Sequence, residues 1–487
     1  MKKPTVIQAF IPIITLLVLI ALNVLIAADD TMAGANQLSL LLAAFVGGAL
    51  AIARGASWDT LVGGISRSFT TAVPAMLILL MVGALSGSWM TSGIIPTMIY
   101  YGLEVLRPEF FLPATVIITV IISVATGSSW STVATIGVAL IAVGNALGID
   151  PAWSAGAIIS GAYFGDKVSP LSDTTNLAAT VGEVELFDHI RFMMRTTIPS
   201  ILLTLVVFTI MGLRAAEGDV DPQSVGIYQQ AMADTYCISG WLMLIPLLVV
   251  VLIARRVPAV PVLMIGTLVA VAAAALFQQP LLTQLAGEPL TWANGYDTLT
   301  RCVYGTTEPS TGLAVVDDLV STGGMMGMMN TIWLIISAMI FAGVMDAGGF
   351  IESITDAMLR RMKSRAPMVT ATTASCLLFN LTTGDQYMSI VIPGKMFQTA
   401  FKRQGYDPCL LTRTLEDGAT ATSVLIPWNT CGATQAAVLG VATAAYLPFA
   451  FFCWLSPLMT VLFAWFGIAQ TRRSHTERIS CRPSSQK

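Results

Sequence analysis

The sequence is built largely from apolar stretches that are each long enough to cross a lipid bilayer. A helix of about 20 apolar residues spans about 30 Å of hydrocarbon. Eight stretches of about this length run without interruption, at 6–28, 36–53, 71–90, 196–213, 236–254, 258–277, 325–345 and 446–468. This pattern predicts an all-α polytopic (multi-pass) membrane protein.

The composition agrees with this fold class and excludes several others. Only 11% of the 487 residues are charged, whereas soluble domains carry about 25%. The 25 basic and 28 acidic residues nearly cancel, so the chain lacks the strongly basic surface of a nucleic-acid-binding protein. The seven cysteines are scattered and lack the paired spacing of a metal site. We therefore expect no nucleic-acid partner, no cofactor and no transition-metal site.

Two further apolar regions, 111–182 and 368–439, are interrupted by Gly, Ser, Thr, Asp and Pro. Such breaks at membrane depth are tolerated only where they line a cavity or are buried against protein. A shift of 257 residues aligns the two regions without a gap and gives nine identities over 45 residues. The matched positions are Thr126-Gly127 with Thr383-Gly384, Gly137 with Gly394, Gly148 with Gly405, Asp150-Pro151 with Asp407-Pro408, Gly161-Ala162 with Gly418-Ala419, and Pro170 with Pro427.

This internal repeat predicts the topology. We interpret each repeat as a re-entrant hairpin followed by a broken helix, so that each repeat crosses the membrane three times. Two plain helices, 236–254 and 258–277, separate the repeats. Five crossings between equivalent points is an odd number, so the repeats are inverted, and the chain has about ten crossings with both termini on one side.

The prediction divides the chain into five segments. They are two N-terminal transmembrane helices (1–56), a first inverted repeat (57–213, hairpin tip 126–129, unwound segment 165–176), linking helices and outer loops (214–324), a second inverted repeat (325–468, hairpin tip 383–386, unwound segment 418–430) and a basic tail (469–487).

The distribution of basic residues supports this topology, because cytoplasmic loops carry an excess of Lys and Arg. If Lys2 and Lys3 are cytoplasmic, 19 of the 25 basic residues fall on the same side. Arg107, Arg214 and Arg301 fall on the opposite side, and Lys167, Lys395 and Arg413 lie within the broken regions. We expect both termini to be cytoplasmic and the membrane to be a bacterial inner membrane.

Broken segments at corresponding positions of two inverted repeats indicate a secondary transporter with a binding site near the membrane midplane. Glycine and proline free backbone carbonyls there, and Ser, Thr and Asn oxygens add the neutral ligands that hard cations prefer. Carboxyl groups at such depth are functional candidates by default. The ion-binding or proton-carrying candidates are Asp166, Asp173, Asp385, Glu416 and Asp417. In the alternative interpretation, Lys167, Lys395 and Arg413 pair with these acids and only hold helices together.

The proton carrier is expected to be an acid. The two histidines, His189 and His475, are predicted to lie in a polar loop and in the tail. Burial favours the neutral form of a carboxyl group, and a cation or a proton can each offset its charge. Sodium and a proton can therefore compete for one carboxylate, which is the minimal mechanism of exchange.

Three stretches resemble the NhaC-type sodium/proton antiporter family of the ion-transporter superfamily. They are AIISGAYFGDKVSPLSDTTNLA (157–178), GSSWST (127–132) and LEDGATATSVLIPWNTCG (415–432). The resemblance implies two inverted repeats and sodium held between each hairpin tip and an unwound helix. It implies one site at Ser128, Ser129, Asp173, Thr174 and Asn176, and another at Asp385, Asn429 and Thr430. The tip residues Thr126 and Thr383 are further candidates for sodium ligands, and Lys167 and Trp428 are candidates for a counter-ion or for contact with a solute.

The leading hypothesis is therefore a secondary active transporter that exchanges Na⁺ for H⁺ by alternating access. The alternative within the same family is a sodium-coupled carrier of a small organic solute, such as an amino acid or a carboxylate. An intramembrane aspartyl protease using Asp166 and Asp417 is the competing enzyme hypothesis, which the repeat and the Ser/Thr/Asn-rich tips disfavour. A homodimer is left open.

Overall fold

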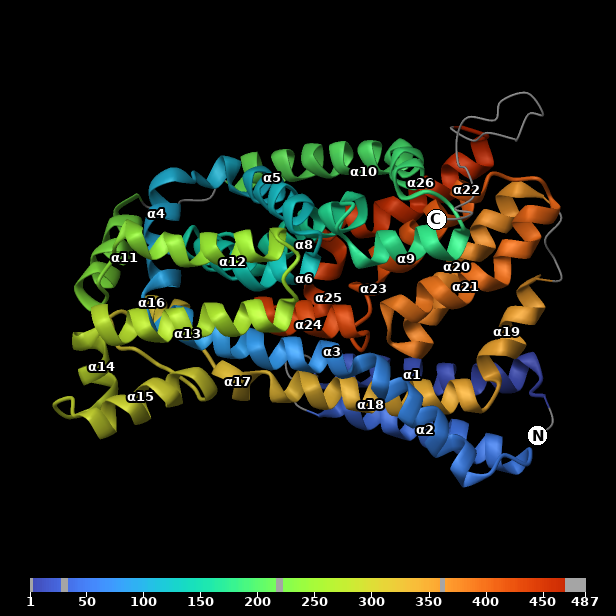
Figure 1. Cartoon of the computed structure of the whole chain (residues 1–487), viewed down its shortest axis with the longest axis horizontal. Coiled ribbons are helices and arrows are strands. Elements are labelled where there is room, and N and C mark those ends of the chain that lie inside the picture. The colour runs from blue at the N-terminus through green and yellow to red at the C-terminus, as the bar shows by residue number, and fades with distance from the viewer. Residues whose placement is uncertain (1–2, 28–33, 216–221, 360–363, 469–487) are drawn as a thin grey trace.

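The computed structural model describes residues 3–27, 34–215, 222–359 and 364–468, and most of this part of the chain is helical (Figure 1). Within it, Thr307 and Thr322 form an isolated antiparallel bridge, and no strand is present. The predicted tail 469–487, with His475, and the basic residues Lys2, Arg360, Arg361 and Lys363 lie outside the described residues.

The helices follow one another in three groups. Up to the first break they are α1 (Val6–Ala27), α2 (Ala35–Ala53), α3 (Trp58–Thr91), α4 (Ile94–Val105), α5 (Pro108–Thr126), α6 (Ser129–Thr132), the π-helical turn η1 (Val133–Gly137), α7 (Val138–Ala146) and α8 (Pro151–Val168). The middle group comprises α9 (Asp173–Gly182), α10 (Leu186–Ala215), α11 (Pro222–Thr235), the 3₁₀-helix η2 (Gly240–Met243), α12 (Leu244–Ala254), α13 (Ala259–Phe277), α14 (Gln279–Ala286), α15 (Trp292–Tyr304) and α16 (Ala314–Leu319). The last group comprises α17 (Gly324–Gly327), α18 (Met329–Ala347), α19 (Phe350–Leu359), α20 (Arg365–Thr383), α21 (Gln386–Arg403), α22 (Pro408–Leu415), the π-helical turn η3 (Glu416–Thr420), α23 (Ala421–Ser423), α24 (Thr430–Leu439), α25 (Thr443–Tyr446), the 3₁₀-helix η4 (Leu447–Phe449) and α26 (Phe451–Phe466).

Eight of the described helices are long and apolar enough to cross a membrane, and the number rises to ten if each of two sharply bent helix pairs is one span. This agrees with the prediction of about ten crossings in an all-α polytopic membrane protein. The predicted plain span 236–254 differs in detail, because α11 and the η2–α12 helix meet at an angle of 89° where the chain is extended at Ser239. The predicted span 446–468 is divided into the short helix η4, which contains Pro448, and the 16-residue helix α26.

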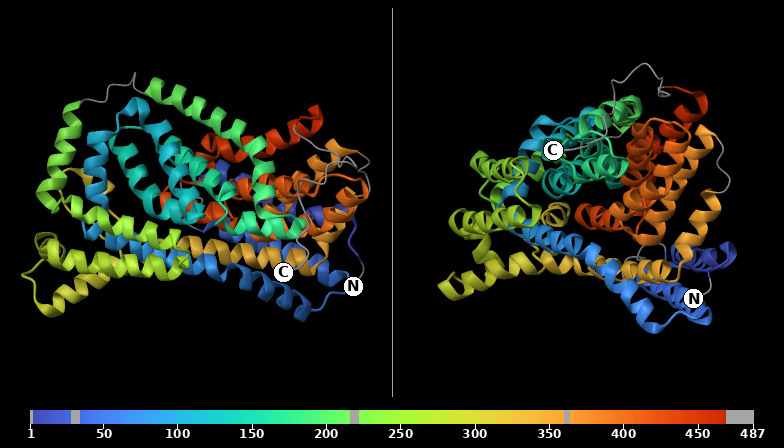
Figure 2. Two further views of the ribbon diagram at one scale, coloured as in Figure 1. Left: turned by 45° about the horizontal axis from the view of Figure 1, so that its top comes forward. Right: turned by 45° about the vertical axis from the view of Figure 1, so that its right-hand side comes forward.

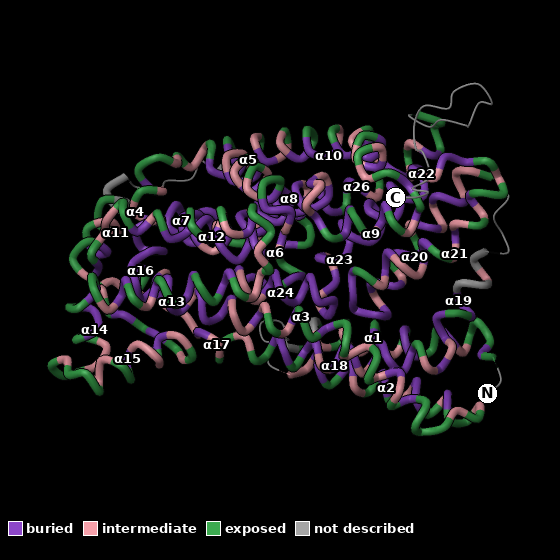
Figure 3. The backbone as a smooth tube through the Cα atoms, in the orientation of Figure 1, coloured by how far each residue is buried: buried purple, intermediate pink, exposed green. Residues whose placement is uncertain are grey.

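The N-terminal helices α1, α2 and α3 lie with α18 along one side of the molecule, and α5, α8 and α10 lie along the opposite side (Figures 1 and 2). Buried positions are concentrated between these layers (Figure 3). Small residues allow the closest helix contacts, as is common between membrane helices. A Cβ atom added at Gly161 or Gly165 of α8 would collide with the backbone of α5. These glycines therefore hold the first hairpin directly against the first broken helix.

The hairpin tips of the two broken regions are built alike. α5 and α20 end 257 residues apart, and each is followed by a glycine in the left-handed conformation, Gly127 with φ 70° and Gly384 with φ 62°. The next residue caps the following helix in both cases. The Ser128 side chain accepts a hydrogen bond from the Ser131 backbone at 3.2 Å, and the Asp385 side chain accepts one from the Met388 backbone at 2.8 Å.

The helix breaks recur at the same spacing. Ser172 and Asn429 are the N-cap residues of α9 and α24, which both run for 10 residues. Glu183 and Gly440, both in the left-handed conformation, follow the two helices. The helices that flank the two hairpin tips lie in opposite halves of the molecule. In Figures 1 and 3, α5 and α7 lie in one half along the long axis, α20 and α21 lie in the other half, and α6 lies near the middle. The inverted orientation in a membrane, the five-segment division and the cytoplasmic termini stay predictions.

Candidate functional site

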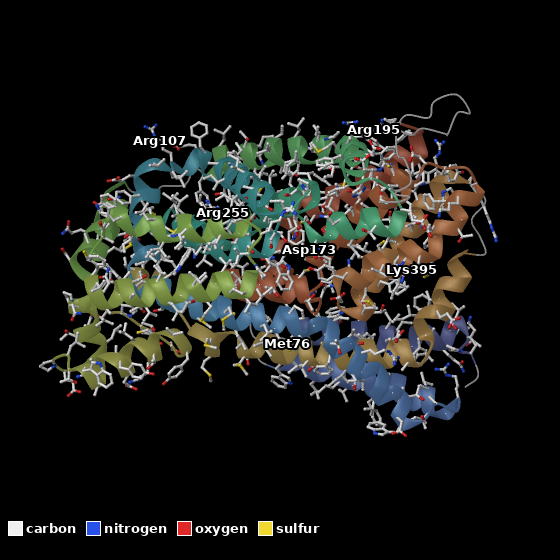
Figure 4. All side chains as sticks on the ribbon, viewed as in Figure 1. Met76, Arg107, Asp173, Arg195, Arg255 and Lys395 are labelled. Atoms are coloured by element: carbon white, nitrogen blue, oxygen red, sulfur yellow. The ribbon has the colours of Figure 1, made fainter. Side chains whose placement is uncertain are left out.

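A cavity of about 1080 Å³ lies where both hairpin tips and both helix breaks meet. Near the middle of the long axis, Asp173 marks this region, while Arg107 and Lys395 lie towards opposite ends (Figure 4). The predicted site residues on the cavity wall are Thr126, Ser128, Asp166, Asp173, Thr174, Asn176, Asp385 and Thr430. Residues more than 250 positions apart in the sequence, such as Ser128 and Asp385, therefore share one cavity.

Asp166 is the most strongly positioned acid on this wall. It lies in the last turn of α8 and is only 7% exposed. Ser129 Oγ of the first tip donates a hydrogen bond to Asp166 Oδ2 at 2.6 Å, and Ser172 Oγ of the break donates one to Oδ1 at 2.7 Å. Thr174 Oγ1 lies 3.0 Å from Ser172 Oγ. The carboxylate and these hydroxyl oxygens form an all-oxygen group of the kind that hard cations prefer.

The first break is held open by side chains rather than by helical hydrogen bonds. Helix termini leave carbonyl groups without partners, and Thr175 Oγ1 donates to two of these, the carbonyls of Asp166 at 3.1 Å and Lys167 at 2.9 Å. Asn176 Nδ2 donates to the carbonyls of Pro170 at 3.0 Å and Ser172 at 2.7 Å. The break is therefore a defined structure that presents Asp166 to the cavity.

Asp173 and Asn176 differ from Asp166 in exposure. Both side chains are exposed on the cavity wall, whereas Thr174 is buried with 3% exposure. At the first position of α9, Asp173 also lies where the positive end of the helix dipole stabilises a negative charge.

The second tip carries its acid differently. Asp385 is the N-cap of α21, lines the cavity and is 3% exposed. Thr430 N–H at the start of α24 donates to the Gly384 carbonyl at 2.8 Å, which joins the second tip directly to the second break. Thr383 Oγ1 donates to the carbonyl of Phe379 at 2.8 Å, inside its own helix.

Two predicted residues of the second half lie behind the cavity wall. Asn429 Oδ1 accepts from the Cys431 backbone at 3.0 Å, and Asn429 Nδ2 donates to Asn380 Oδ1 at 3.1 Å. Trp428 Nε1 donates to the carbonyl of Leu381 at 2.8 Å. These contacts connect the second break to α20, and neither residue is among those that line the cavity.

Lys167 and Asp417 form a fully buried ion pair between the two broken regions. Ser456 Oγ lies 2.7 Å from both Lys167 Nζ and Asp417 Oδ1, and Thr460 and Thr196 donate to Asp417 Oδ2, Thr196 at 3.1 Å. This pairing is the structural role that the alternative interpretation assigned to Lys167. Asp166, by contrast, is bound by Ser129 and Ser172, so the two acids named in the protease hypothesis have different hydrogen-bond partners in this structure.

Of the other charged candidates, Glu416 is fully buried in the turn η3, next to Asp417. Arg413 is fully buried in α22, whereas Lys395 is exposed (Figure 4). The prediction that His189 lies in a polar loop is wrong. It lies in α10, is fully buried, and its Nδ1 is 2.7 Å from Thr412 Oγ1, because the apolar residues around it pack the start of α10 against α22.

Comparison with known proteins agrees with the sequence resemblance. The model of the Na⁺/H⁺ antiporter family matches residues 161–468, which include both helix breaks and the second tip. The Na(+)/H(+) antiporter NhaC of Alkalihalophilus pseudofirmus is 40% identical over 429 residues, with 88% of this chain and 89% of the relative covered. The chain belongs to the Na⁺/H⁺ antiporter family.

Other members of the Na⁺/H⁺ antiporter family are similar over comparable lengths. The Na(+)/H(+) antiporter NhaC of Bacillus subtilis is 37% identical, with 88% of this chain and 91% of the relative covered. The malate-2H(+)/Na(+)-lactate antiporter of the same organism is 35% identical, with 88% and 89% covered. The family thus includes relatives named for ions alone and relatives named for organic anions as well.

The residues that sequence reasoning missed in this family member are mostly hydroxyls. Ser172 contacts Asp166 directly, and its alignment with the N-cap Asn429 was a usable signal. Ser456 and Thr460 are four residues apart on α26, so they share one helix face, but nothing in the sequence connects that face to Asp417. Among the described residues, no group of three or more His, Cys, Asp or Glu side chains could hold a metal ion.

Proposed function

We propose that this membrane protein is a secondary active transporter that exchanges Na⁺ for H⁺ by alternating access. The observation that carries the proposal is the position of Asp166, bound by one serine from the first tip and one from the first break, on the wall of a cavity that Asp385 also lines. Its family membership supports the same function.

In this proposal Asp166 binds one cation at a time. The carboxylate, the hydroxyls of Ser129 and Ser172 and the nearby Thr174 supply oxygen ligands for sodium. A proton on the carboxylate removes the charge that attracts sodium, so the two ions compete. Burial makes the uncompensated carboxylate expensive, so the group is expected to hold one ion or the other as it passes between the two sides.

The second tip is proposed to contribute a second acidic position. Asp385 lines the same cavity, and its carboxylate accepts a hydrogen bond from the Met388 backbone. Asp173 and Asn176, which are exposed on the cavity wall, are proposed to guide ions to the site rather than to enclose them. Glu416 and Asp417 belong to the buried region behind the wall and are proposed not to contact sodium.

The test is ion exchange by the purified protein in liposomes that contain a pH-sensitive dye. The wild-type protein should move protons in response to an imposed sodium gradient, and Asp166→Asn should abolish this exchange. Asp346→Asn removes an acid that is 56% exposed at the end of α18 and serves as the control, with a rate within twofold of wild type. A wild-type protein that shows no sodium-dependent proton movement would contradict the proposal.

The second candidate function is sodium-coupled transport of a small organic anion. It is favoured by the cavity volume of about 1080 Å³, which is close to the upper limit of the about 300–1,000 Å³ typical of pockets for organic molecules and far exceeds the volume of a single ion. Arg256, Trp130 and Tyr387 also line this cavity and could contact an anionic solute. Two results together would favour this candidate. A sodium gradient would drive accumulation of a labelled carboxylate, and no sodium-dependent proton movement would occur when the carboxylate is absent.

A further inference from the structure

Arg413 is a permanently charged side chain that is buried without an acceptor. It is 0% exposed, and its Nε, Nη1 and Nη2 atoms have no hydrogen-bond partner in the described part of the chain. Its guanidinium lies 5.1 Å from the ring of Phe192, and that of Arg195 lies 4.8 Å from the same ring. A guanidinium does not lose its proton in proteins, and an unpaired buried charge is strongly unfavourable. A conformation that gave Arg413 a carboxylate would therefore be favoured at this position.

One candidate partner is Asp417, four residues later in the chain. Side chains at this spacing are neighbours on an α-helix and form favourable ion pairs. In this structure, however, Asp417 is already paired with Lys167, which belongs to α8 in the other broken region. Asp417 thus pairs with one cation across the interface between the two broken regions, while a second cation, Arg413 of the preceding helix α22, makes no hydrogen bond to it in the described part of the chain.

The local backbone provides a way to change partners. α22 ends at Leu415, and Asp417 lies in the π-helical turn η3. Such turns are wider than α-helical turns and occur frequently at functional sites. If η3 became a regular α-helix, the Asp417 side chain would rotate about the helix axis. It would then lie on the same face of the helix as Arg413, four residues earlier.

We propose that Asp417 changes its partner during transport, being paired with Lys167 in the state described here and with Arg413 in the opposite state. The inference rests on the proposed function only in requiring a transport cycle, and it involves no transfer of a proton. Lys167 directly follows Asp166, so the Lys167–Asp417 pair ties the end of α8 to η3. Its release frees the segment that carries the proposed ion site.

The first test compares rates of transport. Arg413→Met keeps much of the side-chain volume but removes the second partner, so the rate should fall at least tenfold while the protein remains folded with its Lys167–Asp417 pair. Arg413→Lys keeps a cation at the same spacing and should retain at least a third of the rate. Arg195→Met is the control, because it removes a cation from the same Phe192 ring and should stay within twofold of wild type. An Arg413→Met rate within twofold of wild type would overturn the proposal.

The second test reads the conformation and does not depend on which ion is carried. Thr71 lies on α3 at the cavity wall and is exposed. In a variant whose native cysteines, including the exposed Cys237 and the cavity-lining Cys431, are replaced by Ala, Thr71→Cys would be labelled by a membrane-impermeant thiol reagent in vesicles of both orientations. Arg413→Met should increase labelling from the side to which the cavity opens, and Lys167→Met should decrease it. Arg413→Met retains the Lys167–Asp417 pair and removes only the proposed second partner. If labelling of this variant equals that of the wild type, partner exchange is rejected, whatever the result for Lys167→Met.

Glu416 is the other acid near Arg413, three residues later, and its carboxylate oxygens have no hydrogen-bond partner among the described residues. If Glu416 were the true second partner, adding Glu416→Gln to Arg413→Met would restore transport by neutralising both members. Partner exchange at Asp417 predicts that the double variant stays as slow as Arg413→Met. The two proposals can fail separately. If labelling shifts in opposite directions in Arg413→Met and Lys167→Met but the wild type shows no sodium/proton exchange, partner exchange is supported and the proposed transported ions are rejected.

Discussion

Ser172 donates a 2.7 Å hydrogen bond to the Asp166 carboxylate across the break between α8 and α9. The two residues are six positions apart, and four non-helical residues, 169–172, separate the helices that carry Asp166 and Asp173. The broken helix therefore closes on its own acid. This contact makes the first break part of the proposed ion site rather than a simple interruption.

The Ser172 hydroxyl should contribute measurably to sodium affinity. Ser172→Ala removes a ligand and a hydrogen bond to a charged group, which is worth about 1.5–3 kcal/mol. The half-saturating sodium concentration should therefore rise at least about tenfold, as measured by sodium-dependent proton movement in liposomes. Thr180→Ala removes a hydroxyl of α9 that bonds only within its helix and should leave the value unchanged. Equal sodium dependence of the Ser172 variant and the wild type would exclude this role.

Two substitutions of Asp385 should distinguish its contribution to stability from its contribution to ion binding. Asn is as good an N-cap as Asp, whereas Ala at an N-cap costs about 1 kcal/mol. Asp385→Asn should keep the thermal unfolding temperature while weakening sodium-driven exchange at least tenfold, and Asp385→Ala should lower both. If Asp385→Asn exchanges as fast as wild type, the residue acts only as the cap of α21.

The two tip glycines should differ in their tolerance of alanine. Both need a left-handed backbone, which costs a non-glycine residue about 1–2 kcal/mol. A Cβ at Gly127 would also come within 2.7 Å of the Leu171 carbonyl carbon, whereas at Gly384 the nearest contact is 3.2 Å, to the flexible end of Met339. Gly127→Ala should thus reduce the yield of folded protein more than Gly384→Ala, as judged by gel filtration in detergent.

Gly405 supplies the control for that comparison. It has φ +68° and no atom within 4 Å of an added Cβ, so Gly405→Ala carries the backbone strain without the collision. Its yield should be at least that of Gly384→Ala. A Gly127→Ala protein that folds as well as Gly405→Ala would show that the contact between the first tip and the break is not required.

Loss of the Asp417 carboxylate should strongly destabilise the protein. Asp417→Asn leaves the Lys167 ammonium buried without a carboxylate, and removing one member of a buried ion pair costs about 3–5 kcal/mol. Denaturant unfolding in detergent measures the change. Glu183→Gln breaks the exposed 2.8 Å pair with Lys402 and should have a far smaller effect, because solvent screens surface pairs. Similar stability of the two variants would contradict the account of the buried pair.

The sequence predicted the positions of the turns better than the contacts between them. Thr126-Gly127 and Thr383-Gly384 were recognisable because a left-handed turn selects glycine, and Pro151 and Pro408 because proline suits the first turn of a helix. Local backbone chemistry leaves a mark in the sequence, so the hairpin tips and helix ends could be inferred.

The pairing of side chains across the fold could not be inferred in the same way. Lys167 and Asp417 are 250 positions apart, and nothing local distinguishes Asp417 from the cavity-lining Asp385. His189 follows Asp188 and precedes Arg191, so its surroundings looked polar, yet the apolar side of α10 carries it into the interior. The family resemblance predicted Asn429 at a sodium site, and Trp428 was a candidate for contact with a solute, but the side chains of both donate hydrogen bonds to α20. Such contacts depend on tertiary packing, which one sequence does not encode locally.

Proton release on sodium binding tests the central claim most directly. The purified wild-type protein in weakly buffered detergent solution, mixed with sodium chloride and followed with a pH indicator, should release protons in a sodium-dependent and saturable manner. Asp166→Asn should release far fewer, and Asp346→Asn should behave as wild type. If sodium binds to the wild-type protein without releasing protons, or if Asp166→Asn releases as many as wild type, competition of the two ions at Asp166 is wrong.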